Sequence, residues 1–333
     1  MFRMKRMVFG MLLCLGLYAQ DYRLGEGMAI GKTGVFAGGY FSLNYWQNDA
    51  RTRQLTFDDA ALMLYGGGSA WRFMAEAELS DVYERRWGVG EGESTDWRVH
   101  AERMYLRYEP SETLRLTLGK FNTPYGFWNL MPINVLRDTT SNPRVVETVL
   151  PRFTTGGSLR IGSVCSGSTL SLLVQASKDL DHAFNGDDHY NNYDVDAHLG
   201  GVYFYEHSRW KMRLNAGAYR ERREDETWLY AYGGIRYAAR KWTLMAETGY
   251  RRDEDAVRSG FGAYIQGAYR FLPKHAGIVR LETVTDYVPD SDDAIVVAGY
   301  TYRPLFPVAC KLEYQHHERN DESRLLTSFS MLF

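Results

Sequence analysis

The sequence contains no apolar run long enough to cross a bilayer as an α-helix. Such a helix needs about 18 or more apolar residues in a row, whereas this chain of 333 residues is 24% charged and has a mean hydropathy of −0.39. Proline and cysteine are also scarce, with 9 and 3 residues. Few prolines suit closely paired strands. The cysteines lack metal-ligand spacing, and Cys165 and Cys310 are compatible either with a disulfide formed after export or with two separate thiols.

An excess of positive charge is missing too, since 39 Lys and Arg stand against 41 Asp and Glu. Residues 1–20 read MFRMKRMVFGMLLCLGLYAQ, with three basic residues, an apolar core from Met7 to Leu17 and a cleavage zone near Ala19. This is the layout of a secretory signal peptide, and a buried first helix is the alternative. Its removal leaves 36 basic against 41 acidic residues, a net charge of −5, which gives no reason to expect nucleic-acid binding.

Aromatic residues in alternating segments are abundant, with 24 Tyr, 16 Phe and 8 Trp. After a short lead at residues 21–34, apolar and polar side chains alternate with period two, as in WKMRLNAGAY (210–219), where Trp210 and Arg213 lie on opposite faces. We predict sixteen strands in the body, residues 35–333, most of them about 9–13 residues long, as a tilted membrane strand requires. They are centred on residues 35–45, 54–66, 71–83, 97–109, 113–120, 156–162, 168–177, 197–206, 210–220, 227–237, 242–251, 259–270, 278–287, 294–302, 308–317 and 323–333.

Two closures compete for these strands: a soluble sandwich or barrel with an apolar interior, and a transmembrane barrel with lipid outside and a polar lumen. The polar faces carry Arg and Glu in mid-strand, which a sandwich core does not hold. Tight turns alternate with longer acidic loops, as at the periplasmic and extracellular ends of outer-membrane barrels. Aromatics at the ends of the apolar stripes indicate an interfacial girdle; they are Trp71, Tyr83, Tyr108, Trp210, Tyr250, Tyr269 and Tyr302. We therefore predict an all-β transmembrane antiparallel β-barrel of about 16 strands.

Two local features refine this prediction. The last segment, RLLTSFSMLF, places an apolar stripe from Leu325 to Phe333 opposite Ser328 and Ser330. We expect this stripe to face lipid and the strand to pair with the first one, closing the barrel. Within residues 98–108 the apolar parity changes near Glu102 and Arg103, which indicates a bulge or an error in register.

One connection, residues 121–155 between the fifth and sixth strands, is longer and more apolar than the others. A loop of this length is usually functional or disordered, and its aromatic and aliphatic residues argue against disorder. Within it, SNPRVVETVL (141–150) predicts a short helix with proline at the first helical position and a stop at Pro151. The loop is either an ordered surface cap or a constriction folded into the lumen, and we favour the constriction.

A signal peptide, sixteen strands, a long folded loop after the fifth strand and a C-terminal Phe333 together resemble a bacterial outer-membrane porin. The stretches GKFNTPYG (119–126), RD (137–138) and PRFTTGG (151–157) are similar to the phosphate-selective porin O/P family. The resemblance implies the outer membrane of a Gram-negative bacterium, a homotrimer, and phosphate selectivity from lumen arginines plus constriction lysines. The terminal aromatic resembles the signal by which the outer-membrane assembly machinery recognises its clients.

The alternation assigns charged side chains of both signs to the lumen. The predicted pore-lining residues are Arg115, Arg160, Lys211, Arg213, Arg280, Lys311, Glu76, Glu247 and Glu282, and the predicted constriction-loop residues are Arg137, Asp138, Arg144, Glu147 and Arg152. A mixed lining is typical of a transverse field across a pore rather than of one anion-binding ladder. About half of these charges are expected to satisfy one another. We predict passive diffusion of small polar or anionic solutes through a water-filled channel, with no cofactor and no metal.

Two other functions suit the same barrel: a structural or adhesive barrel that does not conduct, and a barrel hydrolase. The suggestive clusters are Asp181-His182, Asp187-Asp188-His189 and His316-His317. The first two lie in a polar loop that we expect to be solvated, and a weak calcium site there lacks a loop motif. No serine lies in a nucleophile motif with a base beside it, so we predict that the protein is not an enzyme.

Overall fold

The computed structural model describes residues 22–162, 167–186, 190–288 and 291–333. The predicted signal peptide, Cys165 and the Asp187-Asp188-His189 cluster lie outside these ranges. The thiol of Cys310 is free. Within the described ranges, no helix has the length and apolar character needed to cross a membrane.

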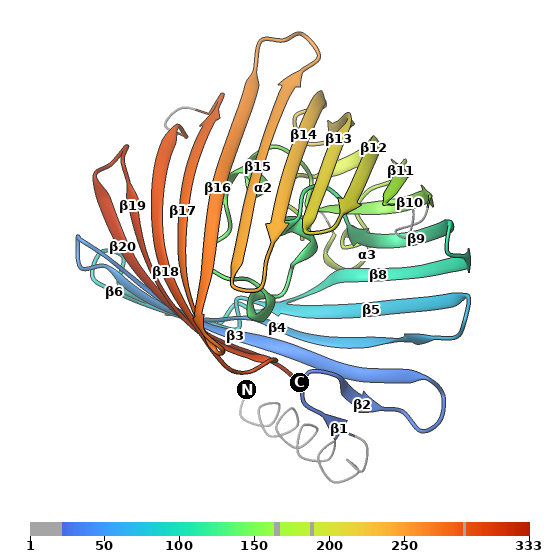
Figure 1. Ribbon diagram of the computed structural model, residues 1–333. Coiled ribbons are helices and arrows are strands. Elements are labelled where there is room, and N and C mark those ends of the chain that lie inside the picture. The colour runs from blue at the N-terminus through green and yellow to red at the C-terminus, as the bar shows by residue number, and fades with distance from the viewer. Residues whose placement is uncertain (1–21, 163–166, 187–189, 289–290) are drawn as a thin grey trace.

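Sixteen antiparallel strands form one closed barrel, which confirms the predicted fold class (Figure 1). They are β3 (Val35–Asn48), β4 (Arg53–Gly67), β5 (Trp71–Ser80), β8 (Arg98–Ser111), β9 (Leu114–Asn122), β10 (Phe153–Ile161), β11 (Ser168–Gln175), β12 (Val195–His207), β13 (Trp210–Glu221), β14 (Glu226–Ala238), β15 (Trp242–Asp253), β16 (Ser259–Leu272), β17 (His275–Asp286), β18 (Asp293–Leu305), β19 (Val308–His317) and β20 (Glu322–Leu332). Each of these strands pairs with the next along the chain, and β20 pairs with β3 to close the ring.

Two small hairpins extend this barrel. A lead hairpin of β1 (Tyr22–Arg23) and β2 (Gly27–Ala29) pairs with β3. A second hairpin of β6 (Tyr83–Trp87) and β7 (Gly92–Ser94) pairs with β4. The lead hairpin and the C-terminus lie at the same end of the barrel (Figure 1). We call this the short-turn end, because the tight turns after β8, β12 and β14 lie there, and the opposite end is the long-loop end.

Each strand divides its side chains between the outside and the lumen. Along β13, Leu214 is 49% exposed on the outer face, whereas the neighbouring Asn215 is 6% exposed inside. Aromatic pairs lie on adjacent strands near the short turns, with centroid separations of 4.3 Å for Trp71–Tyr108, 4.8 Å for Trp210–Tyr237 and 4.4 Å for Trp242–Tyr269. An apolar outer belt edged by aromatic rings is the surface of a transmembrane barrel.

A β-bulge interrupts β8 where the sequence predicted one. Glu76 of β5 pairs with Arg103 and Ala77 pairs with Ala101, so Glu102 is the extra residue. Such a bulge shifts the alternation by one position. Two consecutive charged side chains, those of Glu102 and Arg103, consequently face the lumen.

The helical turns lie in the connections that follow β9 and β11. They are η1 (Trp128–Leu130), η2 (Asn134–Leu136), α2 (Arg144–Thr148) and α3 (His182–Asn185). The helix expected within residues 141–150 is α2. It is shorter than predicted, and Pro143 is its N-cap rather than its first helical residue, because its ψ of 135° is extended.

The last strand closes the barrel as expected. Phe333 N–H donates to the carbonyl of Gly39 at 2.7 Å, and Gly39 N–H donates to the carbonyl of Phe333 at 2.8 Å. Phe329 is 37% exposed on the outside, whereas Ser328 and Ser330 are buried inside. The ring of Phe333 lies over Gly39, where a Cβ would come within 2.7 Å of Cζ. The seam therefore needs a residue without a side chain at this position.

Gly39→Val is expected to lower the yield of closed barrel, because its side chain would collide with the Phe333 ring and with the Ala61 carbonyl, 2.4 Å from the Cβ position. Gly277→Val in β17 is the matched control, since nothing lies within 4 Å of that Cβ position. The measurement is the fraction of heat-modifiable protein on gel electrophoresis after refolding into detergent micelles. Equal yields for the two variants would contradict this account of the seam.

Candidate functional site

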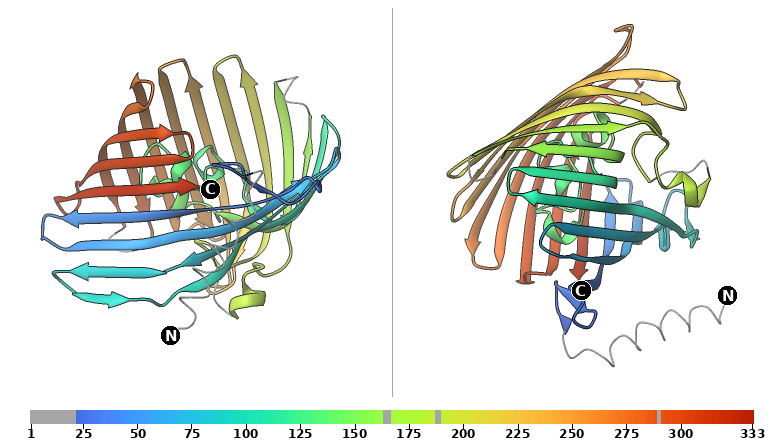
Figure 2. Two further views of the ribbon diagram at one scale, coloured as in Figure 1. Left: turned by 90° about the horizontal axis from the view of Figure 1, so that it is seen from below. Right: turned by 90° about the vertical axis from the view of Figure 1, so that its right-hand side faces the viewer.

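The long connection after β9 folds into the lumen (Figures 1 and 2), so the predicted inward fold is confirmed and the surface-cap alternative is wrong. We call residues 123–152 the inward loop. In the view along the barrel from below, its segments lie inside the ring of strands (Figure 2).

Carboxylates of the barrel wall bind main-chain N–H groups of the inward loop. Glu247 of β15 accepts from Phe127 N–H at 2.5 Å and from Trp128 N–H at 3.1 Å. Glu282 of β17 accepts from Arg144 N–H at 2.7 Å. Hydrogen bonds to an ionised acceptor are stronger than neutral ones. These carboxylates therefore fix the height of the loop in the lumen.

Basic side chains of the barrel wall bind hydrogen-bond acceptors of the same loop. Lys311 Nζ of β19 donates to the carbonyls of Asn134 at 2.5 Å and Thr139 at 3.0 Å. Arg280 of β17 donates to Thr139 Oγ1 at 2.7 Å, and its guanidinium lies 5.5 Å from the ring centroid of Trp128. Both cations are almost completely buried. Both side chains therefore use their hydrogen-bond donors to hold the loop.

Apolar contacts fix the inward loop to opposite sides of the barrel. One cluster joins Val145, Val146 and Val149 to wall residues of β13–β16, among them Tyr219, Tyr232, Met245 and Tyr264. The other joins Ile133 and Val135 to wall residues of β3, β4 and β19, which are Tyr40, Ala61, Met63 and Ala309. Because the two clusters lie on different arcs of the wall, the loop spans the lumen.

The structure divides the predicted pore-lining residues into two groups. Glu76, Glu247, Glu282, Arg280 and Lys311 are no more than 7% exposed and are bonded to the loop or to wall neighbours. The remaining four keep part of their surface and lie toward the short-turn end: Arg115, Arg160, Lys211 and Arg213. Four of the first group hold the inward loop, whereas Glu76 binds Arg103 of the wall. In the second group, Arg213 also donates to the loop carbonyl of Pro124, and Lys211 is paired with Glu206.

The predicted constriction-loop residues also play different parts. Arg137 is buried and donates to two carbonyls of its own loop, and the carbonyl of Asp138 accepts from a hydroxyl of β18. Arg144 and Glu147 are largely exposed and lie 3.8 Å apart. Arg152 lies 5.5 Å from the ring centroid of the neighbouring phenylalanine.

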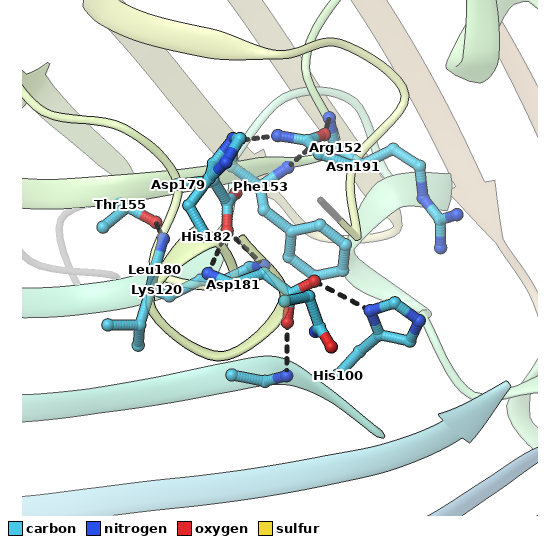
Figure 3. A network of polar contacts seen from close by, with 12 residues as sticks. His100, Lys120, Arg152, Phe153, Thr155, Asp179, Leu180, Asp181, His182 and Asn191 are labelled. Carbon is cyan, nitrogen blue, oxygen red and sulfur yellow. Dashed lines mark hydrogen bonds and ion pairs between the residues drawn. The ribbon is translucent and has the colours of Figure 1, made fainter. Parts of the chain in front are cut away.

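Between β11 and β12, residues 176–186 and 190–194 pack against the wall and the inward loop through contacts that include those of Asp179, Asp181 and Asn191 (Figure 3). We call these residues the second inward loop. Lys120 Nζ pairs with Asp179 at 2.6 Å, with both side chains at most 1% exposed. Asp181 accepts from Ala101 N–H at 2.9 Å and lies 2.7 Å from His100 Nδ1. The expectation of a solvated loop around Asp181 and its neighbour is wrong, since that carboxylate is completely buried.

The second inward loop lies against the first. Asn191 Oδ1 accepts from Arg152 N–H at 2.9 Å, and Asn192 Nδ2 donates to the carbonyl of Leu150 at 2.7 Å. The ring of Tyr190 lies 6.0 Å from that of the residue after Arg152. The two loops therefore form one packed unit inside the barrel.

The environment of Asp181 keeps this carboxyl ionised at neutral pH. Burial alone would raise the pKa of Asp181, but hydrogen bonds from His100 and Ala101 outweigh it and the pKa is lowered. A lowered pKa contributes stability above the ordinary carboxyl range, and this contribution is lost as the pH falls through the lowered value. The loop anchor is thus fully formed near neutral pH.

The other suggestive cluster, at the end of β19, makes one ordinary contact with a carboxylate and one with a hydroxyl. His317 Nδ1 lies 2.7 Å from Asp293 Oδ2, and His316 Nδ1 lies 3.3 Å from Ser323 Oγ. Over the described parts of the chain, no three His, Cys, Asp or Glu side chains are placed to hold a metal ion.

A cavity of about 460 Å³ lies at the short-turn end, between the wall from β8 to β13 and the inward loop above it. We call it the basic vestibule, because Arg103, Arg107, Arg115, Arg160 and Arg213 line it. The carboxylate in the lining, that of Glu206, is paired with Lys211 at 2.8 Å. Hydroxyl groups complete the wall; they belong to Thr117, Ser158, Thr169 and Ser171.

Three of these guanidinium groups have no carboxylate partner among the described residues: those of Arg107, Arg160 and Arg213. Arg107 lies 5.0 Å from the ring centroid of Tyr105, and Arg213 lies 4.9 Å from that of Phe204. Stacking on a ring orients a guanidinium without using its N–H donors. Arg213 Nη1 already donates to the carbonyl of Pro124 at 3.2 Å, so the guanidinium groups available to a solute are chiefly those of Arg107 and Arg160.

The site prediction omitted Arg103, which joins the vestibule because the bulge turns its side chain inward. The change of parity near Glu102 was the signal that could have found it. Arg115 and Arg160 lie directly opposite each other on β9 and β10, a proximity that the separate strands do not reveal in sequence.

No family model matches the sequence, and no curated protein sequence matches it either. Solved structures do match the fold. The anion-selective porin of Comamonas acidovorans aligns with a TM-score of 0.59 at 10% identity, covering 90% of this chain and 99% of that chain. OmpF of Salmonella typhi in complex with daunomycin aligns at 0.63 and 12%, covering 92% and 100%. The outer-membrane channel DcaP of Acinetobacter baumannii aligns at 0.58 and 11%, covering 92% and 100%.

The chain therefore has the fold of the bacterial outer-membrane porins. The closed antiparallel barrel of sixteen strands is what it shares with them. Identities near 10% show a common fold and carry no information about the solute.

Lys120→Met is expected to destabilise the folded protein by about 3–5 kcal/mol, because it leaves Asp179 buried without its partner. The double variant Lys120→Met, Asp179→Leu is expected to recover most of that loss. The measurement is the free energy of unfolding in urea with the protein in detergent micelles. The control is Arg144→Gln, which breaks a pair that is 49% and 40% exposed and is expected to cost under about 1 kcal/mol. A single variant as stable as this control would contradict the tight anchoring of the second inward loop.

Proposed function

We propose that this protein is a porin that conducts small anionic solutes by passive diffusion across the outer membrane. The basic vestibule is the observation that supports this proposal most. A cluster of guanidinium groups facing water-filled space attracts anions and repels cations, and lining charge sets the selectivity of a pore.

The placement of arginines in the vestibule lowers the stability of the sheet, and formation of the barrel does not require it. Arg160 lies directly opposite Arg115 in the register of β9 and β10, and like charges in such positions destabilise a sheet by about 0.2–1 kcal/mol. Glu109 at the adjacent turn forms an ion pair with Arg115 and reduces this repulsion, but Arg160 has no such carboxylate among the described residues. A solute anion supplies the missing counter-charge.

Selectivity for phosphate, which the resemblance to the porin O/P family implies, has less support. That family uses constriction lysines. Here Lys120 is paired with Asp179 and Lys311 is bonded to loop carbonyls, so neither ammonium group is free to bind a solute. We propose general anion preference carried by arginine, and membership of the O/P family stays a hypothesis.

A barrel that does not conduct is the second candidate, and one observation favours it: the two inward loops span the lumen and are anchored on both sides. Three expectations stay predictions: that the protein is not an enzyme, that it forms a homotrimer, and that the assembly machinery recognises Phe333. Outer-membrane lipid is the partner that the apolar belt requires.

Single-channel recording in planar bilayers tests the proposal. Stepwise conductance and a reversal potential of the sign for anion preference are expected across a KCl gradient. Arg160→Gln and Arg213→Gln are each expected to shift the reversal potential toward cation preference. The matched control is Arg220→Gln, an outward-facing arginine paired with Asp196, which is expected to leave it unchanged. A folded protein that never conducts would favour the second candidate, and cation preference would overturn the proposed selectivity.

Deletion of residues 135–147 is expected to raise the single-channel conductance, because this segment crosses the lumen between the two apolar clusters. The wall charges that it binds would be solvated by the water that replaces it. Deletion of residues 88–91, at the tip of the β6–β7 hairpin, is the control and is expected to change nothing. An unchanged conductance in the first variant would show that the inward loop does not limit the pathway.

A further inference from the structure

A second cavity, of about 190 Å³, lies beside the basic vestibule at the same end of the barrel. Its lining is mainly apolar, with side chains of Met63, Tyr65, Met74, Ile133 and Leu332. Three glycines of the lead hairpin and β3 complete the lining, and a Cβ at each of them would collide with Pro307 or with main-chain atoms. We call it the apolar recess.

Arg103 connects the two cavities, because it lines both of them. Its position follows from the bulge in β8, which turns it into the lumen beside Glu102. Its Nε is bonded to Glu76, whereas its Nη2 is buried and has no hydrogen-bond partner. A buried donor without a partner is destabilising, so an acceptor that reached this group at the junction of the two cavities would be stabilising.

The inward loop forms the common roof. Leu130 of the loop lines the vestibule and Ile133 lines the recess. A solute held beneath this roof can therefore touch arginine on one side and apolar surface on the other. Methionine side chains, which supply two of the recess residues, are flexible and polarizable, and they adapt to apolar groups of varied shape.

We propose that this end of the lumen binds amphipathic organic anions, with the anionic head on Arg103 and Arg107 and an alkyl or aryl part in the apolar recess. This inference rests on the proposed anion channel and names the class of solute that it binds best. Inorganic anions would fill the vestibule alone. An organic anion would add the apolar contact, and each buried methylene strengthens binding by a factor of about four.

The geometry of β8 fits such a solute. Arg103, Tyr105 and Arg107 are successive lumen-facing positions, spaced by about 7 Å along the strand. Arg103 and Arg107 are therefore about 13 Å apart along the strand, and the Arg107 guanidinium lies over Tyr105 between them, 5.0 Å from its ring centroid. The head would lie between these two arginines, while the apolar part crosses to Met74, the partner of Tyr105 on β5. Hydroxyl groups on the opposite wall of the vestibule, such as Thr117 and Ser171, accept or donate to the head group.

The test is blockade of the chloride current of single channels by hexanoate and by acetate. We expect saturable blockade by hexanoate at a concentration at least ten-fold lower than that for acetate. Hexylammonium, of the same chain length and opposite charge, controls for effects on the bilayer and is expected not to block. Similar blocking concentrations for the two carboxylates, in a channel that still prefers anions, would overturn the apolar recess and leave the proposed function intact. A channel without anion preference would overturn the proposed function itself.

Met74→Gln tests the recess directly. It conserves volume, and we expect it to remove most of the difference between hexanoate and acetate while leaving the reversal potential unchanged. Met63→Gln serves as a second variant of the same cavity. Met104→Gln, at an outward-facing position that is 39% exposed, is the matched control and is expected to keep the full difference. Preserved discrimination in both recess variants would contradict the proposal.

Discussion

A barrel of sixteen strands encloses more space than the side chains of its own wall can fill, and this geometric constraint governs the rest of the structure. Charged wall side chains facing that space must be solvated or paired. In this protein two loops supply the partners. Glu247 and Glu282 accept main-chain N–H groups, and Lys311 donates to main-chain carbonyls. The loops supply hydrogen-bond partners for the charged side chains of the wall, and these bonds hold the loops in one position.

The same constraint explains why the charges differ along the barrel axis. At the level of the loops, acidic and basic side chains are buried and matched, so little free charge remains. At the short-turn end, arginines of the wall from β8 to β13 line the vestibule, and the guanidinium groups of Arg107 and Arg160 have no carboxylate partner among the described residues. A mixed lining was expected to give a transverse field. The structure instead separates a neutralised middle from a basic end.

The alternation of apolar and polar residues predicted the sixteen strands, the outward stripe of the last strand and the bulge near Glu102, because each depends on neighbours in sequence. The roles of the lumen charges could not be predicted in this way. Arg280 and Arg160 have the same pattern in sequence, yet one is covered by the inward loop and the other is not. Similarly, Asp181 reads as a solvated loop residue until the fold brings it to Ala101, far away in the chain.

Most of the side chains that hold the first inward loop and most of those that line the vestibule lie on different arcs of the wall, although Arg213 belongs to both sets. Lys311, Arg280 and Glu247 belong to β15–β19, whereas Arg107 and Arg160 belong to β8 and β10. Changes in one set need not disturb the other, because additivity holds between groups that share no partner. Arg103 lies between the two sets, since its carboxylate partner Glu76 belongs to the packed middle while its own side chain lines both cavities. At this position the attachment of the packed interior and the proposed recognition of a solute meet.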